Sequence, residues 1–391
     1  MPKVLIAICS LIYLLDGLLH SILGPLAPEI AGDLGLTNAQ LGPIFSANLL
    51  GQCIGLIVVP MLADRSSQRR VVLLALLGFG LAQAATALAQ GATSLFIWRL
   101  ITGLFLGGAL PSCLALVTAA APAPRRGFAI MVLFTGYGLG ATLAGVVATA
   151  FSGFGGWRMA MLAAGLACLA TALLGALYLR DPAAGDGASE RASPERSQPL
   201  LIVSKRYLVG TLMLWLLFIS MLTISYCLTS WLPTLLVEVG RDRQFAALSI
   251  SIFSLGGIIA ALGVGLLIDR WGATRTLISF LCIATVLLFA VGQVLATASG
   301  VVLMTLLALC GFFVLGAYGG INVVLATFYP ASIRATGIGW AKSIGRIGTL
   351  VAPVLIGSAL TLGMAETSIM SLFAVPAALA AVFLAVIAFR Y

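Results

Sequence analysis

The chain is a succession of long apolar stretches separated by short polar turns. A stretch of about 17 to 25 apolar residues is long enough to cross a bilayer as one α-helix. The stretches lack the polar/apolar alternation of membrane barrel strands. The sequence therefore predicts an all-α integral membrane protein. Its twelve transmembrane helices are expected near residues 4–25, 39–62, 71–89, 94–118, 127–150, 157–179, 207–231, 246–268, 275–296, 302–328, 337–360 and 367–389.

Composition supports this assignment and excludes other classes. Charged residues make up 8% of the 391 residues, whereas soluble domains contain about 25%. The stretch at 4–25 lacks a small-residue cleavage site, so we expect it to be the first span rather than a signal peptide. The seven cysteines lie inside predicted helices without a CxxC pair, which indicates small buried residues rather than metal ligands. With one histidine and no HExxH motif, we expect no enzyme, metal site or cofactor.

The distribution of Lys and Arg predicts the orientation in the membrane. Of 21 such residues, fifteen fall on the side that carries both termini and three on the opposite side. Cytoplasmic loops carry the excess of positive charge, so we expect a multi-pass protein of the cell (inner) membrane with both termini in the cytoplasm. The net charge of +9 then reflects topology and does not indicate nucleic-acid binding.

A polar segment rich in Pro, Gly, Ser and mixed charge divides the chain in the middle, and it is expected to be a flexible linker. It separates a predicted six-helix bundle at 1–180, through a cytoplasmic linker at 181–206, from a second bundle at 207–391. The halves repeat at an offset of roughly 205, because Leu62–Arg65 follows the second span and Leu267–Arg270 the eighth. Two pseudo-symmetric halves are typical of transporters that expose one site to either side in turn.

Ionisable residues inside predicted spans indicate the chemistry of the site. A charged side chain at the bilayer centre costs about 2.5 to 3.5 kcal/mol or more, so it must face a partner or a watery cavity. Lys342 and Arg346 share a helix face at i and i+4, as do Asp16 and His20. With Arg99 and a neutral His20, the five groups sum to +2. The excess predicts a small anionic substrate, with a carboxylate held by Arg346 through two parallel hydrogen bonds and Lys342 beside it.

The remaining site residues follow from position. Asp16 is the sole carboxylate inside a span, so we assign it, with His20 and Arg99, to proton coupling. Arg99 has a structural alternative, which is to tie helices through backbone carbonyls or to pair permanently with Asp16. His20 can instead be an interfacial residue, and Lys342 can extend toward the cytoplasm. Further substrate contacts are assigned to Tyr137, Tyr318 and Asn322.

Several segments resemble one known family. They are Asp16-Gly17, Asp33–Gly42, Leu62–Arg65 with Arg69-Arg70, Arg99–Pro111, Trp231–Leu236 and Tyr329–Ala341 running into Gly345–Gly348. On these segments the chain resembles the major facilitator superfamily over nearly its whole length, and within it most the aromatic acid:proton symporter family. The first span reads Asp16-Gly-Leu-Leu19 where that family usually has Asp-Gly-Phe-Asp, and Lys342 replaces an expected neutral residue. The added positive charge strengthens the expectation of an anionic substrate.

The resemblance implies a function and a gate. It implies a monomeric secondary transporter that moves a small organic anion, a carboxylate such as an aromatic acid, by proton-coupled symport and alternating access. The alternative is an exchanger, facilitator or exporter of the same fold; the lack of Pro in Gly136–Gly145 favours uptake. The gate implied on the cytoplasmic side consists of Asp64, Arg65, Asp269 and Arg270.

Overall fold

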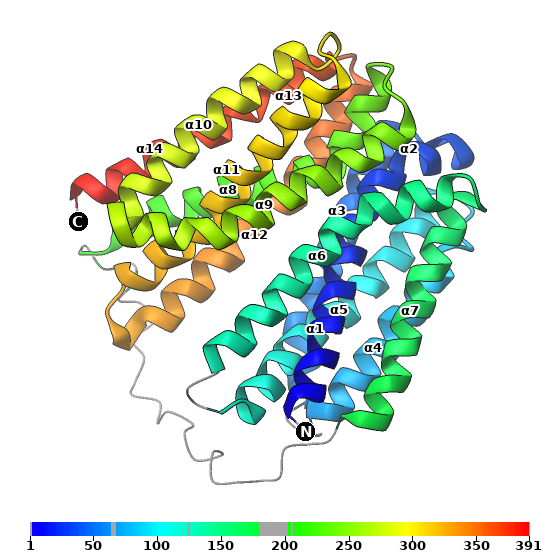
Figure 1. Cartoon of the computed structure of the whole chain (residues 1–391), viewed down its shortest axis with the longest axis horizontal. Helices are drawn as coiled ribbons and strands as arrows, with labels where there is room; N and C mark the ends of the chain where they lie inside the picture. The colour runs from blue at the N-terminus through cyan, green and yellow to red at the C-terminus, as the bar shows by residue number, and fades with distance from the viewer. Residues whose placement is uncertain are drawn as a thin grey trace. The chain divides into compact units, whose positions relative to one another are not determined.

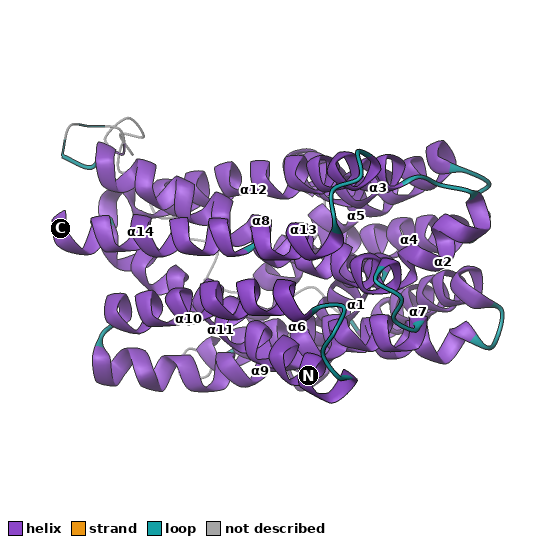
Figure 2. Cartoon of the chain, turned by 90° about the horizontal axis from the view of Figure 1, so that it is seen from above, coloured by secondary structure: helices purple, strands orange, loops and turns teal. Residues whose placement is uncertain are grey.

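The computed structural model of the chain describes residues 2–63, 68–122, 126–179, 202, 204 and 206–390. Regular structure in these ranges is helical, and no strand occurs in them (Figure 2). The prediction of an all-α protein is therefore confirmed. Most of the predicted linker at 181–206 lies outside the described residues.

The chain divides into two compact units (Figure 1). Unit 1 takes residues 1–188 and 243–251, and unit 2 takes residues 189–242 and 252–391. The helices of unit 1 are α1 (Pro2–Ser21), α2 (Leu23–Leu34), α3 (Asn38–Ala63), α4 (Gln68–Thr86), α5 (Ala92–Ala120), α6 (Arg126–Ser152) and α7 (Gly156–Tyr178). Those of unit 2 are α8 (Leu208–Glu238), α9 (Arg243–Trp271, whose first turns belong to unit 1), α10 (Ala273–Val294), α11 (Gly300–Phe328), α12 (Ala331–Thr361), α13 (Glu366–Leu372) and α14 (Ala374–Arg390).

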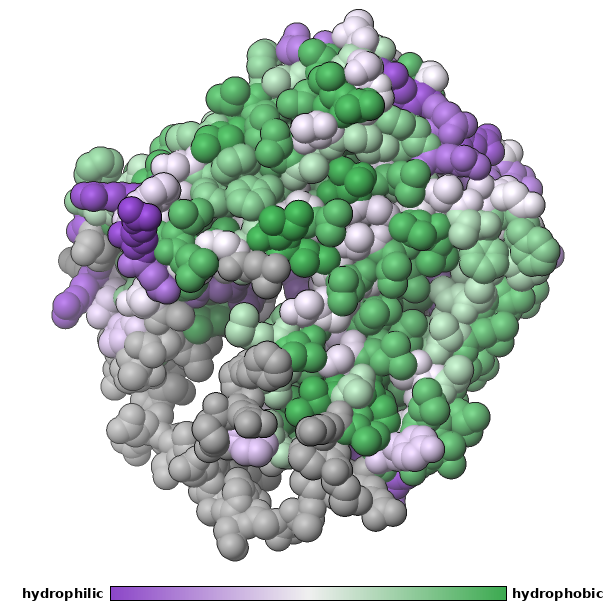
Figure 3. Space-filling model, in the orientation of Figure 1, coloured by the Kyte–Doolittle hydropathy of each residue, from purple (hydrophilic) through white to green (hydrophobic). Residues whose placement is uncertain are grey.

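The lengths and surface of these helices suit a bilayer. Among the described residues, eleven helical segments are long and apolar enough to cross a membrane. They overlap every predicted span except 39–62, whose residues form the 26-residue α3. Hydrophobic side chains cover most of the face drawn in Figure 3. Such a surface meets lipid tails without cost, because no polar group is withdrawn from water.

Two of the predicted spans are interrupted, and proline explains both breaks. Proline has no amide hydrogen, and its ring clashes with the carbonyl group four residues earlier. Pro25 therefore stops the first span at Ser21, where α1 ends before α2 begins. Pro376 stops the last span at Leu372 in the same way, where α13 ends before α14.

Glycines let pairs of helices pack backbone to backbone. Between α3 and α5 of unit 1, a methyl group on Gly51 would overlap the carbonyl oxygen of Leu100. One on Gly103 would overlap the carbonyl oxygen of Asn48. Because the contact is made from both sides, neither helix can accept a larger residue here without moving. Small residues at such spacing are the usual basis of close helix packing in membranes.

Unit 2 repeats this interface between α9 and α11. A methyl group on Gly256 would overlap the carbonyl oxygen of Ala308, and one on Gly311 that of Phe253. Gly256 and Gly311 correspond to Gly51 and Gly103 at nearly the offset that relates the loop motifs. The sequence repeat is therefore also a repeat of helix packing.

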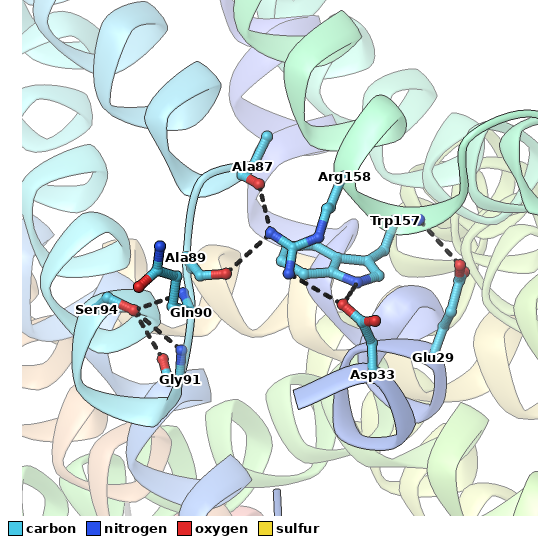
Figure 4. Close-up of polar contacts among 9 residues, drawn as sticks. All are labelled: Glu29, Asp33, Ala87, Ala89, Gln90, Gly91, Ser94, Trp157 and Arg158. Carbon is cyan, nitrogen blue, oxygen red and sulfur yellow. Dashed lines mark hydrogen bonds and ion pairs between the residues drawn. The ribbon is translucent and has the colours of Figure 1, made fainter. Parts of the chain in front are cut away.

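A polar cluster joins α2, α7 and the loop between α4 and α5 in unit 1 (Figure 4). Arg158 donates to the carbonyl oxygens of Ala87 and Ala89 at 2.8 and 2.9 Å, and it pairs with Asp33 at 3.1 Å. The indole N–H of Trp157 also donates to Asp33, at 3.0 Å. We call Asp33, Trp157, Arg158 and the two carbonyl groups the Arg158 clasp.

Unit 2 has a comparable contact built from a different helix. Arg241, which follows α8, donates to the carbonyl oxygens of Leu295, Ala296 and Ala298 in the loop between α10 and α11. Each unit thus uses one arginine to bind the carbonyl groups of the corresponding loop.

Candidate coupling and anion-binding residues

Asp16 is buried inside unit 1, with 1% of its surface exposed. Its neighbours include Tyr13 of α1, Cys113 of α5 and Cys168 of α7. The carboxyl group therefore belongs to the interior of the helix bundle and not to its lipid-facing surface.

Arg99 of α5 is equally buried, with 1% exposed. Its guanidinium group donates to the carbonyl oxygen of Leu19 in α1 at 3.0 Å. It also donates to the side-chain oxygen of Gln83 in α4 at 3.3 Å. Arg99 therefore links α5 to both helices, and its contact with α1 is made to a backbone carbonyl group.

His20 and Tyr137 face each other across α1 and α6. Their ring centroids lie 6.1 Å apart with an angle of 57° between the planes, and both side chains are half-buried. His20 lies one residue after Leu19, whose carbonyl group binds Arg99. Of the three residues predicted for proton coupling, Asp16 and His20 lie in the last turns of α1, and Arg99 binds a carbonyl group there.

Gln83 is the residue of this neighbourhood that sequence reasoning missed. It is fully buried in α4 and bonds to both Arg99 and the sulfur atom of Met161. The only sequence signal was a neutral amide within an apolar stretch. Asn48 and Gln52 give the same signal, so it could not single out Gln83.

In unit 2, Arg346 and Tyr318 come together. Both side chains are half-buried, and Arg346 lies within electrostatic range of the Tyr318 hydroxyl group. The Tyr318 ring packs against Phe218 of α8, with centroids 6.5 Å apart and the planes at 72°. This arrangement places a cation, a phenol and an apolar ring at the junction of α8, α11 and α12.

Lys342 and Arg346 lie away from the apolar surface of α12. The apolar side chains exposed on that helix are Trp340, Ile347, Val351 and Leu355. At 3.6 residues per turn, both cations lie about 100° or more around the helix from this stripe. Lys342 is exposed, and Arg346 is half-buried. The two cations therefore lie on a face of the helix apart from its apolar stripe.

The other predicted site residues have varied surroundings. The amide nitrogen of Asn322 donates back to the carbonyl oxygens of Tyr318 and Gly319 in its own helix, so only its side-chain oxygen is left for a ligand. Asp269 and Arg270 are exposed near the end of α9. Asp64 and Arg65 lie outside the described residues.

The described fold has two helical units, apolar surfaces and buried ionisable side chains. These features together define a multi-pass membrane transporter. The model of the Major Facilitator Superfamily matches residues 9–353 and 242–391, and the chain belongs to this superfamily. It is a transporter and not an enzyme, as predicted.

Relatives of similar length match nearly the whole chain. A gallate transporter of Pseudomonas putida is 31% identical over 96% of this chain and 90% of its own length. A 4-hydroxybenzoate transporter of Acinetobacter baylyi is 33% identical over 96% and 88%. A 3-(3-hydroxy-phenyl)propionate transporter of Escherichia coli is 34% identical over 94% and 89%.

Solved structures show the same fold. A D-xylose-proton symporter matches with a TM-score of 0.83 at 17% identity, over 98% of this chain and 97% of that one. A bacterial homologue of the human lysosomal transporter Spinster matches with a TM-score of 0.79 at 18% identity, over 99% and 96%. The predicted fold class and family are therefore confirmed.

Proposed function

We propose that the protein takes up a small aromatic carboxylate together with protons. The observation that carries this proposal is the full-length similarity to transporters of gallate, 4-hydroxybenzoate and 3-(3-hydroxy-phenyl)propionate. Each of these names denotes a carboxylic acid with a hydroxylated ring. A substrate of this class needs a cation for the carboxylate and an aromatic or apolar surface for the ring.

Unit 2 offers both groups. Arg346 binds the carboxylate through its planar guanidinium group, which suits two parallel hydrogen bonds. Tyr318, backed by Phe218, faces the ring, and Lys342 and Asn322 of the same unit contribute further contacts. Tyr137 belongs to unit 1, and its contact with the substrate stays a prediction. Binding in a site from which water is excluded strengthens the ionic contact.

Proton coupling is assigned to Asp16, with Arg99 and His20. A carboxyl group exchanges its proton when the balance between burial and nearby positive charge changes. Asp16 is buried, and the guanidinium group of Arg99 is bound to α1 within a helical turn of it. Movement between two states of the transporter would change that balance.

We also propose how the two halves of the chain work and how the protein lies in the membrane. Bundles at 1–180 and 207–391, joined by a linker at 181–206, alternate between two states, and both termini lie in the cytoplasm of a cell membrane. The protein acts as a monomer.

A binding and uptake experiment tests the proposed function. The purified protein is heated with gallate, 4-hydroxybenzoate, 3-(3-hydroxyphenyl)propionate, succinate or D-xylose, and a ligand that binds the folded state raises the apparent Tm. We expect a rise with the aromatic acids alone. Uptake of 4-hydroxybenzoate into proteoliposomes, with and without an inward proton gradient, then distinguishes symport from exchange. Uptake that ignores the gradient favours the exchanger or facilitator, and a Tm unchanged by every aromatic acid contradicts the proposal.

A further inference from the structure

Gln83 is a primary amide buried in the middle of an apolar bundle. None of its surface is exposed, and its neighbours along α4 are Ala82 and Ala84. Burying an amide in hydrocarbon without hydrogen-bond partners is strongly unfavourable. The side chain therefore persists here through its partners on α5 and α7.

The two partners fix the orientation of the amide. Its nitrogen donates to the sulfur atom of Met161 on α7 at 2.9 Å, and its oxygen accepts from Arg99 at 3.3 Å. A thioether offers only an acceptor, and a guanidinium group offers only donors. Turning the amide over would place donor against donor at Arg99. Gln83 can therefore satisfy both neighbours in one orientation only.

The same contact restrains the guanidinium group. One terminal nitrogen of Arg99 donates to Gln83 and the other to the carbonyl oxygen of Leu19. Because the group is planar and its donors have fixed directions, two acceptors on different helices define its plane. Leu19 lies in the last turn of α1, where carbonyl groups are available to donors from outside the helix.

We propose that Gln83 is a positioning residue, which holds the Arg99 guanidinium group against α1 and thereby sets the pH dependence of proton-coupled transport through Asp16. This inference rests on the proposed proton coupling. The groups near Asp16 are Tyr13 on α1, Cys113 on α5 and Cys168 on α7, and Arg99 on α5 binds the carbonyl group of Leu19, three residues after Asp16. Tyr137 on α6 faces His20. Of these groups, Arg99 carries the permanent positive charge.

The test compares Gln83→Leu and Gln83→Glu with Gln293→Leu. Gln293 lies on α10, the helix that corresponds to α4, and donates to Ser371 at the surface of unit 2. 4-Hydroxybenzoate uptake into proteoliposomes is measured across a series of external pH values, alongside exchange of the same compound at equal pH on both sides. The apparent Tm of each purified variant is measured over the same pH series without substrate.

We expect Gln83→Leu to lower proton-driven uptake about tenfold, the size expected for losing one hydrogen bond to a charged group. Exchange falls less, because it needs no net proton movement. The half-maximal pH moves upward by about half a unit or more, since a less well placed positive charge favours a protonated carboxyl group. Gln83→Glu shifts it further, because its carboxylate competes for the guanidinium group. Gln293→Leu keeps the wild-type profile.

The outcomes separate the two levels of the proposal. If wild-type uptake ignores the proton gradient, the proposed coupling is wrong and the role of Gln83 falls with it. If the wild type is coupled but both Gln83 variants keep its pH profile, coupling stands and Gln83 is only structural. If a variant takes up too little substrate to give a pH profile, the pH dependence of its Tm is compared with that of the wild type. A curve parallel to the wild-type curve contradicts the inference, and a curve displaced along the pH axis supports it.

Discussion

At the scale of single residues, the sequence identified the charged side chains inside the membrane spans more readily than their hydrogen-bond partners. Asp16, Arg99 and Arg346 stand out because an ion inside an apolar stretch is costly and therefore has a specific place. Gln83 did not stand out, since a neutral amide is tolerated wherever a hydrogen bond exists. The buried acceptors of Arg99 come from α1 and α4, and helix packing alone brings them together.

Arg346→Lys should weaken binding of 4-hydroxybenzoate by about ten- to a hundredfold in Kd. Lysine keeps the charge but cannot offer the paired, planar donors that a carboxylate accepts. Isothermal titration of the purified protein measures the effect, and Arg275→Lys, an exposed position on α10, is the matched control. Wild-type affinity in Arg346→Lys would place the anion site elsewhere.

Lys342→Ala should weaken binding of a dicarboxylate more than that of a monocarboxylate, because only a dicarboxylate can use both charges.

Asp16→Asn should abolish uptake driven by a pH gradient while leaving exchange of substrate. The amide has nearly the shape of the carboxyl group but cannot carry a proton through the cycle. Uptake and exchange in proteoliposomes measure the two activities. Asp242→Asn removes a carboxylate from an exposed position instead and should behave as wild type. Gradient-driven uptake that survives in Asp16→Asn would assign coupling to another group.

At the scale of helices, apolar length predicted where spans lie but not how they end or meet. The breaks before α2 and α14 were missed although Pro25 and Pro376 are visible in the sequence, because many membrane helices keep a proline. Here α5, α8 and α12 each contain one without ending, and α3 contains two. Glycines form the closest contacts between helices, but which helices they join depends on the three-dimensional fold.

Gly103→Ala should lower the apparent Tm of the purified protein. A methyl group there meets the Asn48 carbonyl group, and overpacking of this kind costs about 1 to 3 kcal/mol. Gly319→Ala on α11 is the control, because nothing lies within 4 Å of the added carbon. That variant should be as stable as wild type or more so, since alanine is the better helix former. Equal loss of stability in both variants would contradict the packing argument.

The two loop-binding arginines should act separately. Arg158→Gln should speed hydrogen exchange in residues 87–91 without changing residues 295–298, and Arg241→Gln should do the reverse. Each variant releases the loop carbonyl groups of its own unit, and released loops open more often. Mass spectrometry of exchanged peptides measures both loops in one sample, so each variant serves as the control for the other. Hydrogen-exchange rates that stay at wild-type values in both loops would show that Arg158 and Arg241 do not restrain these loops.

At the scale of the whole molecule, the fold followed from the sequence because three signals agreed. The number of apolar stretches, the repeated loop motifs and the central polar segment each predict two halves, and the chain divides into two units. The functional site was harder to assign, since its predicted residues are divided between the units. Asp16, His20, Tyr137 and Arg99 belong to unit 1, and Arg346, Lys342, Tyr318 and Asn322 belong to unit 2.

Asp64→Asn and Asp269→Asn should each favour the state open to the cytoplasm and slow transport. Both positions follow corresponding spans of the two halves, and a carboxylate there can bind nearby arginines and the positive ends of helices. Labelling of single cysteines from each side of the membrane measures the shift between states. Labelling and transport that both match the wild type would remove these residues from the gate.

The glycine contacts between helices also bear on how the chain is assembled during synthesis. α1 meets α6, since a methyl group on Gly17 or Gly140 would overlap a carbonyl oxygen of the other helix. α3 meets α5 in the same manner, with α4 between them in the chain. The first helices to leave the ribosome therefore cannot reach their tightest neighbours until the later ones have been inserted. Nascent chains that stop before residue 126 should stay sensitive to protease, and those that extend past residue 152 should become resistant.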